Sequence, residues 1–164
     1  MNNNKFSVAG ITENTLPLWD SGLCQRWHTN PELSKTNDCL AGHHGRVAQI
    51  ILKNHPDPSI NLIRAALTHD AGEYLAGDLP YDFKIQCPEI AKQHSLYEAV
   101  ARDTVAGPFP DLTDIENTWL KWADRMDAYL WASHHGADMT KHDWIAAQDE
   151  INRLGEALAA EGEK

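Results

Sequence analysis

The sequence predicts an all-α domain, a bundle of about six helices that spans residues 16–160. Three observations favour it: apolar residues recur at helical spacing, strand-like alternation is absent, and proline or glycine clusters separate the periodic stretches. With 164 residues and a hydrophobic fraction of 42%, the chain can bury one core without disulfides or structural metals. We therefore expect one domain over 1–164, with residues 1–15 as a polar N-terminal arm.

The first half of the chain predicts three helices. Residues 16–27 carry Leu16, Leu18, Trp19, Leu23 and Trp27 at helical spacing. A polar loop over 29–38 leads to a second helix over 39–54, with Leu40, His43, Val47, Ile50 and Ile51 along one side. The stretch 55–58 (HPDP) ends that helix, and Ser59 can cap a third helix over 60–74.

The second half predicts three more helices. A turn over 77–80 leads into an irregular segment that ends at Cys87. Pro88 is suited to the first turn of a fourth helix, which ends near Gly107. A fifth helix covers about 115–135. The last begins at about 140 and ends near 155 or continues into the tail.

The net charge and the cysteines of the chain make some kinds of ligand and site less expected. The chain has 14 Lys and Arg against 24 Asp and Glu, and a formal charge of −10. This charge disfavours binding of nucleic-acid polymers but leaves room for a small phosphorylated ligand held by a few local cations. The three cysteines (Cys24, Cys39 and Cys87) form no CxxC motif, so neither a disulfide framework nor a thiolate zinc site is expected.

Nothing in the sequence indicates a membrane or export segment. The first residues lack the basic and apolar regions of a secretory signal, and no apolar run reaches the roughly 20 residues that span a bilayer. We expect a cytoplasmic protein.

The most informative residues are His43, His69, Asp70 and Asp124. Each lies on an apolar stripe where an ionisable group is costly to bury without compensation. They come from three predicted helices, and a divalent cation would compensate all of them together. Two imidazoles and two carboxylates suit Zn, Co or Mn, with Mg, Ni or Fe as further possibilities.

Each of these residues also has a simpler interpretation. A single His43 on an apolar face is more often a hydrogen-bonded core histidine, and Arg125 or Arg64 could neutralise Asp124. A second HD pair, at 142–143, is read as a cap or surface feature. The coincidence of four inward groups on separate helices favours the metal site.

Further polar residues near this constellation suit phosphate chemistry. Glu73 could hold or deprotonate an attacking water, and Asp78 could protonate a leaving oxygen. The alternatives are a solvated glutamate near a helix end and an aspartate favoured by turn geometry. Arg26 and Lys84 could bind phosphate oxygens, and Trp27 could pack on a sugar or base, although tryptophan is more often core. The roles of His28 and His44 stay open.

The pattern H…HD…D, formed by His43, His69-Asp70 and Asp124, resembles the HD-domain phosphohydrolase superfamily. The segments "HHGRVAQI", "ALTHDAGEYLAGDLPYDFK" and "LKWADRMDAYL", together with Arg26-Trp27, are similar to one branch of it. That branch contains the bacterial 5'-deoxynucleotidases and the short phage dATP (dNTP) triphosphohydrolases. The resemblance spans residues 24–131.

The resemblance implies an HD-domain helical bundle around one divalent metal ion, with the four residues of the pattern as ligands. Glu73 would act on the water, Asp78 at the leaving group, Arg26 and Lys84 on phosphate, and Trp27 on the deoxyribose. The implied reaction cleaves the 5' phosphoester of a 2'-deoxynucleotide, releasing phosphate or triphosphate. A homo-oligomer, dimer or hexamer, is also implied. The alternatives are hydrolysis of another nucleotide signal, such as a cyclic nucleotide or an alarmone, and a non-catalytic nucleotide-binding module.

Overall fold

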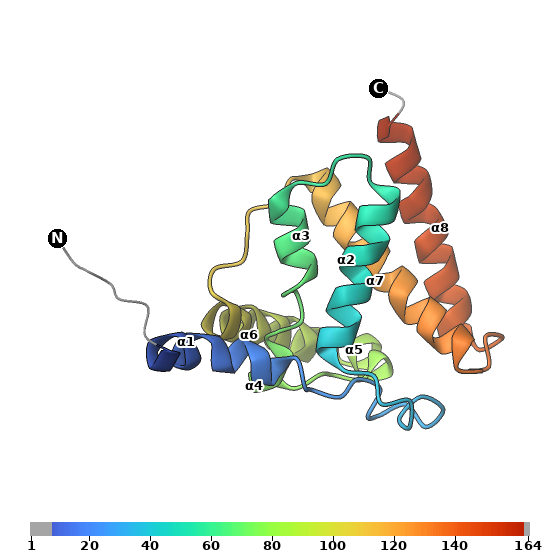
Figure 1. Cartoon of the computed structure of the whole chain (residues 1–164). Helices are drawn as coiled ribbons and strands as arrows, with labels where there is room; N and C mark the ends of the chain where they lie inside the picture. Colours follow the sequence, from blue (N-terminus) through green and yellow to red (C-terminus); the bar gives the residue numbers. More distant parts are fainter. Residues whose placement is uncertain (1–7, 163–164) are drawn as a thin grey trace.

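A computed structural model describes residues 8–162, and within them the regular elements are all helices apart from one isolated bridge between Gln25 and Cys39. The all-α prediction is confirmed. The helices are α1 (Val8–Ser21), α2 (Leu40–Asn54), α3 (Ile60–Ala66), α4 (Glu73–Ala76), α5 (Tyr81–Gln86), α6 (Pro88–Ala106), α7 (Asp114–His134) and α8 (His142–Gly162). In Figure 1, α2, α3 and α7 stand together, α8 runs beside α7, and α1, α4 and α6 lie at the base.

The core is built where α2, α3 and α7 meet. Its buried residues are Val47, Ala48, Ile51, Leu62, Ala66 and Ala123, with tryptophans 119 and 122 packed against them. A second cluster joins the loop before α2 to α7 and α8 through Leu33, Ala132, Ala137 and Trp144. Removing these apolar side chains from water stabilises the arrangement and fixes α2 against α7.

Helix starts follow the expected local chemistry. The Ser59 hydroxyl accepts the backbone N–H of Leu62 and caps α3, as predicted. Thr113 and Glu116 form a capping box at the start of α7, and the Ser59 hydroxyl also bonds to Glu116. These bonds hold the first turns of α3 and α7 side by side.

The helices differ from the predictions in four ways. The expected arm is helical from residue 8, while residues 1–7 lie outside the described part, and α1 ends at Ser21 rather than at 27. A short helix, α5, forms in the segment expected to be irregular. The predicted helix over 60–74 is broken by turns at 67–72. Eight helices therefore occupy residues 8–162, against about six expected.

The break has a local cause. The Thr68 hydroxyl donates to the carbonyl of Arg64, and the His69 ring lies 3.1 Å from the carbonyl of Ala66. Both side chains occupy backbone acceptors that a continuing helix would use. Tighter turns follow, with the N–H of Ala71 bound to the carbonyl of Thr68.

Gly72, at the end of these turns, lets the chain approach α6 closely. A Cβ atom there would lie 2.2 Å from the carbonyl oxygen of Glu98 and 3.0 Å from the backbone nitrogen of Arg102. Since backbone atoms cannot swing aside, a larger residue would push α4 away from α6.

We expect Gly72→Ala to lower the free energy of unfolding by about 1–3 kcal/mol, as overpacking does. Gly45→Ala is the matched control, because a Cβ on Gly45 meets nothing within 4 Å and alanine favours the helix interior. Urea unfolding of both variants measures the difference. Equal stabilities would contradict the close approach.

Within residues 8–162 no helix is long and apolar enough to cross a bilayer.

Candidate metal centre and active site

The structure brings His43, His69, Asp70 and Asp124 to one point, with one nitrogen or oxygen from each lying within 4.8 Å of the others. The Nε2 atom of His43 lies 3.1 Å from Nε2 of His69, 3.2 Å from Asp124 Oδ1 and 3.4 Å from Asp70 Oδ2. His43 comes from α2, Asp124 from α7, and the adjacent pair from the turns after α3. The turns, rather than the predicted helix, let both members of the pair reach the same point.

Both histidines are oriented by their other ring nitrogen. His43 Nδ1 donates to Asp127 Oδ2 at 2.7 Å, and His69 Nδ1 donates to the carbonyl of Ala66 at 3.1 Å. The two Nε2 lone pairs are then left facing each other and two carboxylates. This donor set fits a divalent cation, which would hold the nitrogens and carboxylate oxygens together.

The electrostatics of the cluster also favour a cation. Burial lowers the pKa of His43, but hydrogen bonds to Asp124, Asp127 and Asp70 outweigh it and raise the pKa to about 10. Burial raises the pKa of Asp124, but hydrogen bonds to His43 and His69 hold it well below its usual range. The carboxylates thus keep their charge and attract protons to the imidazoles, and a bound metal would displace those protons.

A third carboxylate, Asp127, contacts the cluster and was not predicted from the sequence. It is 2% exposed and lies one turn after Asp124 on α7. Arg46 Nε donates to Asp127 Oδ1 at 2.6 Å, and Arg46 Nη2 donates to Asp38 Oδ1 at 2.9 Å. This network fixes the carboxylate that orients His43. The i, i+3 spacing from Asp124 was the available signal.

Glu73 lies beside the cluster, at the start of α4. Its carboxylate, with those of Asp70 and Glu98, forms a group whose oxygens lie within 4.8 Å of one another. Burial and the charges of Asp70, Asp78 and Glu98 raise the pKa of Glu73 to about 9. A cation beside Asp70 would offset these charges and bring Glu73 toward the range of a general base. Glu98, on α6, was not predicted from sequence.

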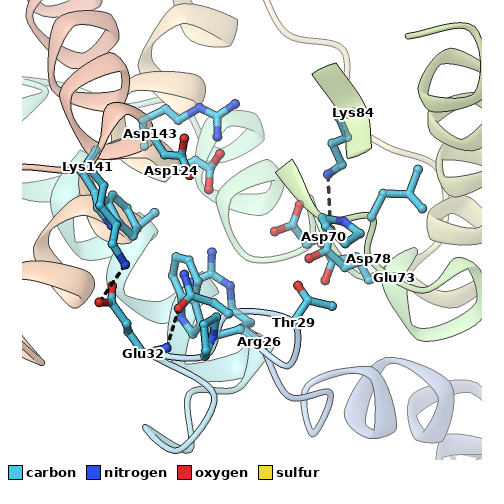
Figure 2. A pocket seen from close by; sticks show the side chains of 18 of the residues that line it. Arg26, Thr29, Glu32, Asp70, Glu73, Asp78, Lys84, Asp124, Lys141 and Asp143 are labelled. Carbon is cyan, nitrogen blue, oxygen red and sulfur yellow. Dashed lines mark hydrogen bonds and ion pairs between the residues drawn. The ribbon is translucent and has the colours of Figure 1, made fainter. Parts of the chain in front are cut away.

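Figure 2 shows how the remaining predicted residues surround one cavity of about 460 Å³. Asp70, Glu73, Asp78 and Lys84 lie on one side of it, and Asp124 and Asp143 lie on the other. Lys84 Nζ lies 3.2 Å from Asp78 Oδ1. Arg26 and Trp27 also line the cavity. The predicted catalytic and phosphate-binding side chains therefore share a single space with the carboxylates of the cluster.

Comparison with known proteins shows the family of the chain. The family model described as 5'-deoxynucleotidase YfbR-like matches residues 23–158. The chain belongs to this family. It is 34% identical to a 5'-deoxynucleotidase of Vibrio cholerae and 30% identical to one of Vibrio vulnificus, over 66% of this chain and 66% of each relative. The 5'-deoxynucleotidase YfbR of Salmonella paratyphi B is 37% identical over 40% of both chains.

The alignments therefore span just under two thirds of the Vibrio proteins' length. No solved structure matches the chain significantly. The predicted resemblance to the 5'-deoxynucleotidase branch of the HD-domain superfamily is confirmed.

In this YfbR-like chain the neighbouring His44 stays outside the cluster. It is 4% exposed, and its Nε2 accepts the backbone N–H of Asp70 at 3.4 Å. Burial and the nearby His69 lower the pKa of His44 to about 3, so the ring is neutral. His44 thus positions the backbone that carries Asp70. The side chain of His28 is exposed.

Neither arginine that could neutralise Asp124 forms an ion pair with it in the described residues. Arg125 forms an ion pair with Glu150, with Nε and Oε2 3.1 Å apart, rather than with Asp124. Arg64 is exposed on α3. At the second HD pair, His142 is exposed as expected, while Asp143 reaches the edge of the cavity.

Trp27 has an unusual backbone. Its φ of 64° lies in the left-handed region, which is costly for a bulky residue. Its indole Nε1 donates to Asp38 Oδ2 at 3.0 Å, and the Arg26 guanidinium lies 3.2 Å from the same oxygen. Asp38 therefore holds two cavity-lining side chains in place.

Replacing Asp127 by asparagine is expected to lower metal affinity about 10–100-fold, as loss of an outer-shell ligand partner does. The amide can keep the contact to Arg46 only in part and no longer stabilises the charge on His43. Titration with Zn²⁺ against a competing chelator measures the affinity. Unchanged affinity would show that Asp127 does not support metal binding.

The ion-free protein is expected to lose stability as pH rises above about 7. The raised pKa values of His43, about 10 against 6.5, and of Glu73, about 9 against 4.5, both mean that the folded state binds protons more tightly. The stabilisation from these protons is complete below the pKa values of the unfolded state. It is lost as the pH rises through the pKa values of the folded state. Thermal unfolding with EDTA from pH 6.5 to 9.5 should show a falling midpoint, and added Zn²⁺ or Mn²⁺ should flatten it. A rising midpoint with EDTA would contradict this.

Proposed function

We propose that this chain is a metal-dependent 5'-deoxynucleotidase, which hydrolyses the 5' phosphoester of a 2'-deoxynucleoside monophosphate to the deoxynucleoside and phosphate. The observation that carries the proposal is the convergence of two bare imidazole nitrogens and two carboxylates beside Glu73, at a cavity that also contains Arg26 and Lys84. The names of the relatives agree with it.

The metal ligands in this proposal are His43, His69, Asp70 and Asp124. When bound, a divalent cation such as Zn²⁺, Co²⁺ or Mn²⁺ would polarise the phosphate and lower the pKa of a nearby water. The protein supplies the remaining chemistry. Glu73 accepts the proton of the attacking water, the new P–O bond forms, and the bond to the 5'-oxygen breaks. Asp78 gives that oxygen its proton.

Arg26 and Lys84 neutralise the phosphate oxygens in this scheme. Arg26 already has two carboxylate partners, Asp38 and Asp127. Little uncompensated positive charge from Arg26 is therefore left for the extra phosphates of a triphosphate. This balance favours a monophosphate over the triphosphate alternative.

Trp27 provides selection for the deoxyribose. Because Asp38 occupies its only polar atom, the fixed indole offers the sugar an apolar wall. A 2'-hydroxyl placed there would lose its water without gaining a partner.

The test is a panel of mono- and triphosphates of the four deoxynucleosides, with ribonucleotides and cyclic nucleotides beside them, assayed with and without Zn²⁺, Co²⁺ or Mn²⁺. We expect metal-stimulated release of orthophosphate from deoxynucleoside monophosphates. Tripolyphosphate as the product would assign a triphosphohydrolase. Turnover of ribonucleotides or cyclic nucleotides alone would overturn the deoxynucleotidase assignment.

We also propose that the protein is a homo-oligomer. α1 and α6 pack together yet leave large apolar side chains exposed, among them Trp19 at 62% and Val100 at 64%. Exposed apolar clusters of this kind are typical of subunit contacts. Light scattering on the purified protein gives the mass; a monomer at high concentration would contradict the proposal.

A further inference from the structure

A side pocket of about 160 Å³ opens off the active-site cavity, between α7, the start of α8 and the loop before α2. The residues that line both spaces are Trp27, Asn30, Arg125, Ala128, Asp143 and Trp144. The two spaces therefore adjoin each other. A molecule whose phosphate lies at the cluster would reach the side pocket along these shared residues.

The side pocket lies where the base of a bound nucleotide would be placed. Lys84, Asp78 and Glu73 occupy the opposite side of the cavity, where charged groups crowd together (Figure 2). The side pocket instead has the indoles of Trp27 and Trp144, whose ring centroids lie 6.0 Å apart. Small side chains such as Ala128 leave space beside them. An aromatic wall with open space in front of it suits stacking of a nucleobase.

Arg125 is the cationic donor among the residues that line this pocket. Arg125 follows Asp124 on α7. Among the described residues, its polar contact is an ion pair between its Nε and Glu150. That buried Nε lacks a well-aligned hydrogen bond. Glu150 is also paired with Lys121, at 2.7 Å. The terminal amino groups of Arg125 are thus free to bind a ligand in the pocket.

We propose that the side pocket binds the base of the substrate and that Arg125 makes it selective for guanine. This inference rests on the proposed nucleotidase function. Guanine presents two adjacent acceptors, O6 and N7, that match the two donors of a guanidinium, whereas adenine presents an amino donor in place of O6. The Asp143 carboxylate, at the mouth of the same pocket, can accept from the N1–H and the amino group of guanine.

The experiment compares kcat/KM for dGMP, dAMP, dCMP and dTMP in the wild-type protein, Arg125→Gln and Arg64→Gln. We expect the wild type to prefer dGMP over dAMP by about tenfold or more, the effect of one bidentate contact. Arg125→Gln should lower kcat/KM for dGMP about tenfold, mainly through KM, and leave dAMP unchanged or improved, since glutamine pairs with adenine. Arg64→Gln, on an exposed residue of α3, should change nothing.

Two results would overturn the inference while the nucleotidase function stands. One is equal kcat/KM for all four bases in the wild type. The other is an equal loss with all four bases in Arg125→Gln, which would assign Arg125 to the phosphate. If Arg125→Gln misfolds, Asp143→Asn serves in its place and should weaken dGMP selectively. If no deoxynucleotide is hydrolysed, the proposed function fails, and calorimetry with deoxyguanosine and deoxyadenosine then tests the pocket: equal or no binding refutes it.

Discussion

Replacing Glu73 by glutamine is expected to reduce deoxynucleotide hydrolysis by about 10²–10⁴-fold, the usual contribution of a positioned general base. Glutamine keeps the size of the side chain but cannot take a proton from water. Since Glu73 lies outside the four-residue cluster, metal content should stay at the wild-type level. Steady-state kinetics and elemental analysis on the same preparation measure both quantities.

The matched control is Glu89→Gln, which makes the same change on an exposed residue at the start of α6. It should retain full turnover. Wild-type turnover in Glu73→Gln would remove Glu73 from the reaction, whereas a loss of metal in that variant would make it a ligand.

Asp124→Asn is expected to abolish activity together with metal binding. The substitution removes one of two carboxylates that face both imidazoles and contributes a neutral amide instead. The affinity should fall by more than the roughly 10–100-fold that follows loss of an outer-shell partner. Elemental analysis after dialysis should find a metal-free variant.

Asp149→Asn, on an exposed aspartate of α8, is the control for the change in charge and should keep its metal. Full metal occupancy in Asp124→Asn would mean that three residues suffice to hold the ion. That result would remove Asp124 from the ligand set.

Half of the cluster could be predicted because two of its four residues lie on regular helices. His43 and Asp124 lie on inward stripes of α2 and α7, and α2 was expected at 39–54 and begins at Leu40. Helical periodicity fixes which side of a helix faces the core, so the inward position of these two side chains follows from spacing alone. The turns around His69 do not follow from spacing, because they depend on side chains that bind backbone carbonyls.

Other parts of the site depend on contacts far apart in sequence. Asp38 lies in a polar loop, and its importance comes from Trp27, Arg26 and Arg46, which the fold brings to it. Glu98 lies close to Asp70 because Gly72 allows α6 to pack tightly against this part of the chain. Such partners have no periodic signature. Asp127 did have one, since it follows Asp124 by one helical turn.

The loop before α2 is fastened at two points, by Leu33 in the core and by Asp38 in the network around Arg46. Thr29 and Glu32, between these anchors and Trp27, form part of the rim of the cavity. Exchanges at such rim positions would reshape the entrance while the anchors and the cluster behind them keep their places. Substrate choice can therefore diverge within this scaffold without altering the chemistry at its centre.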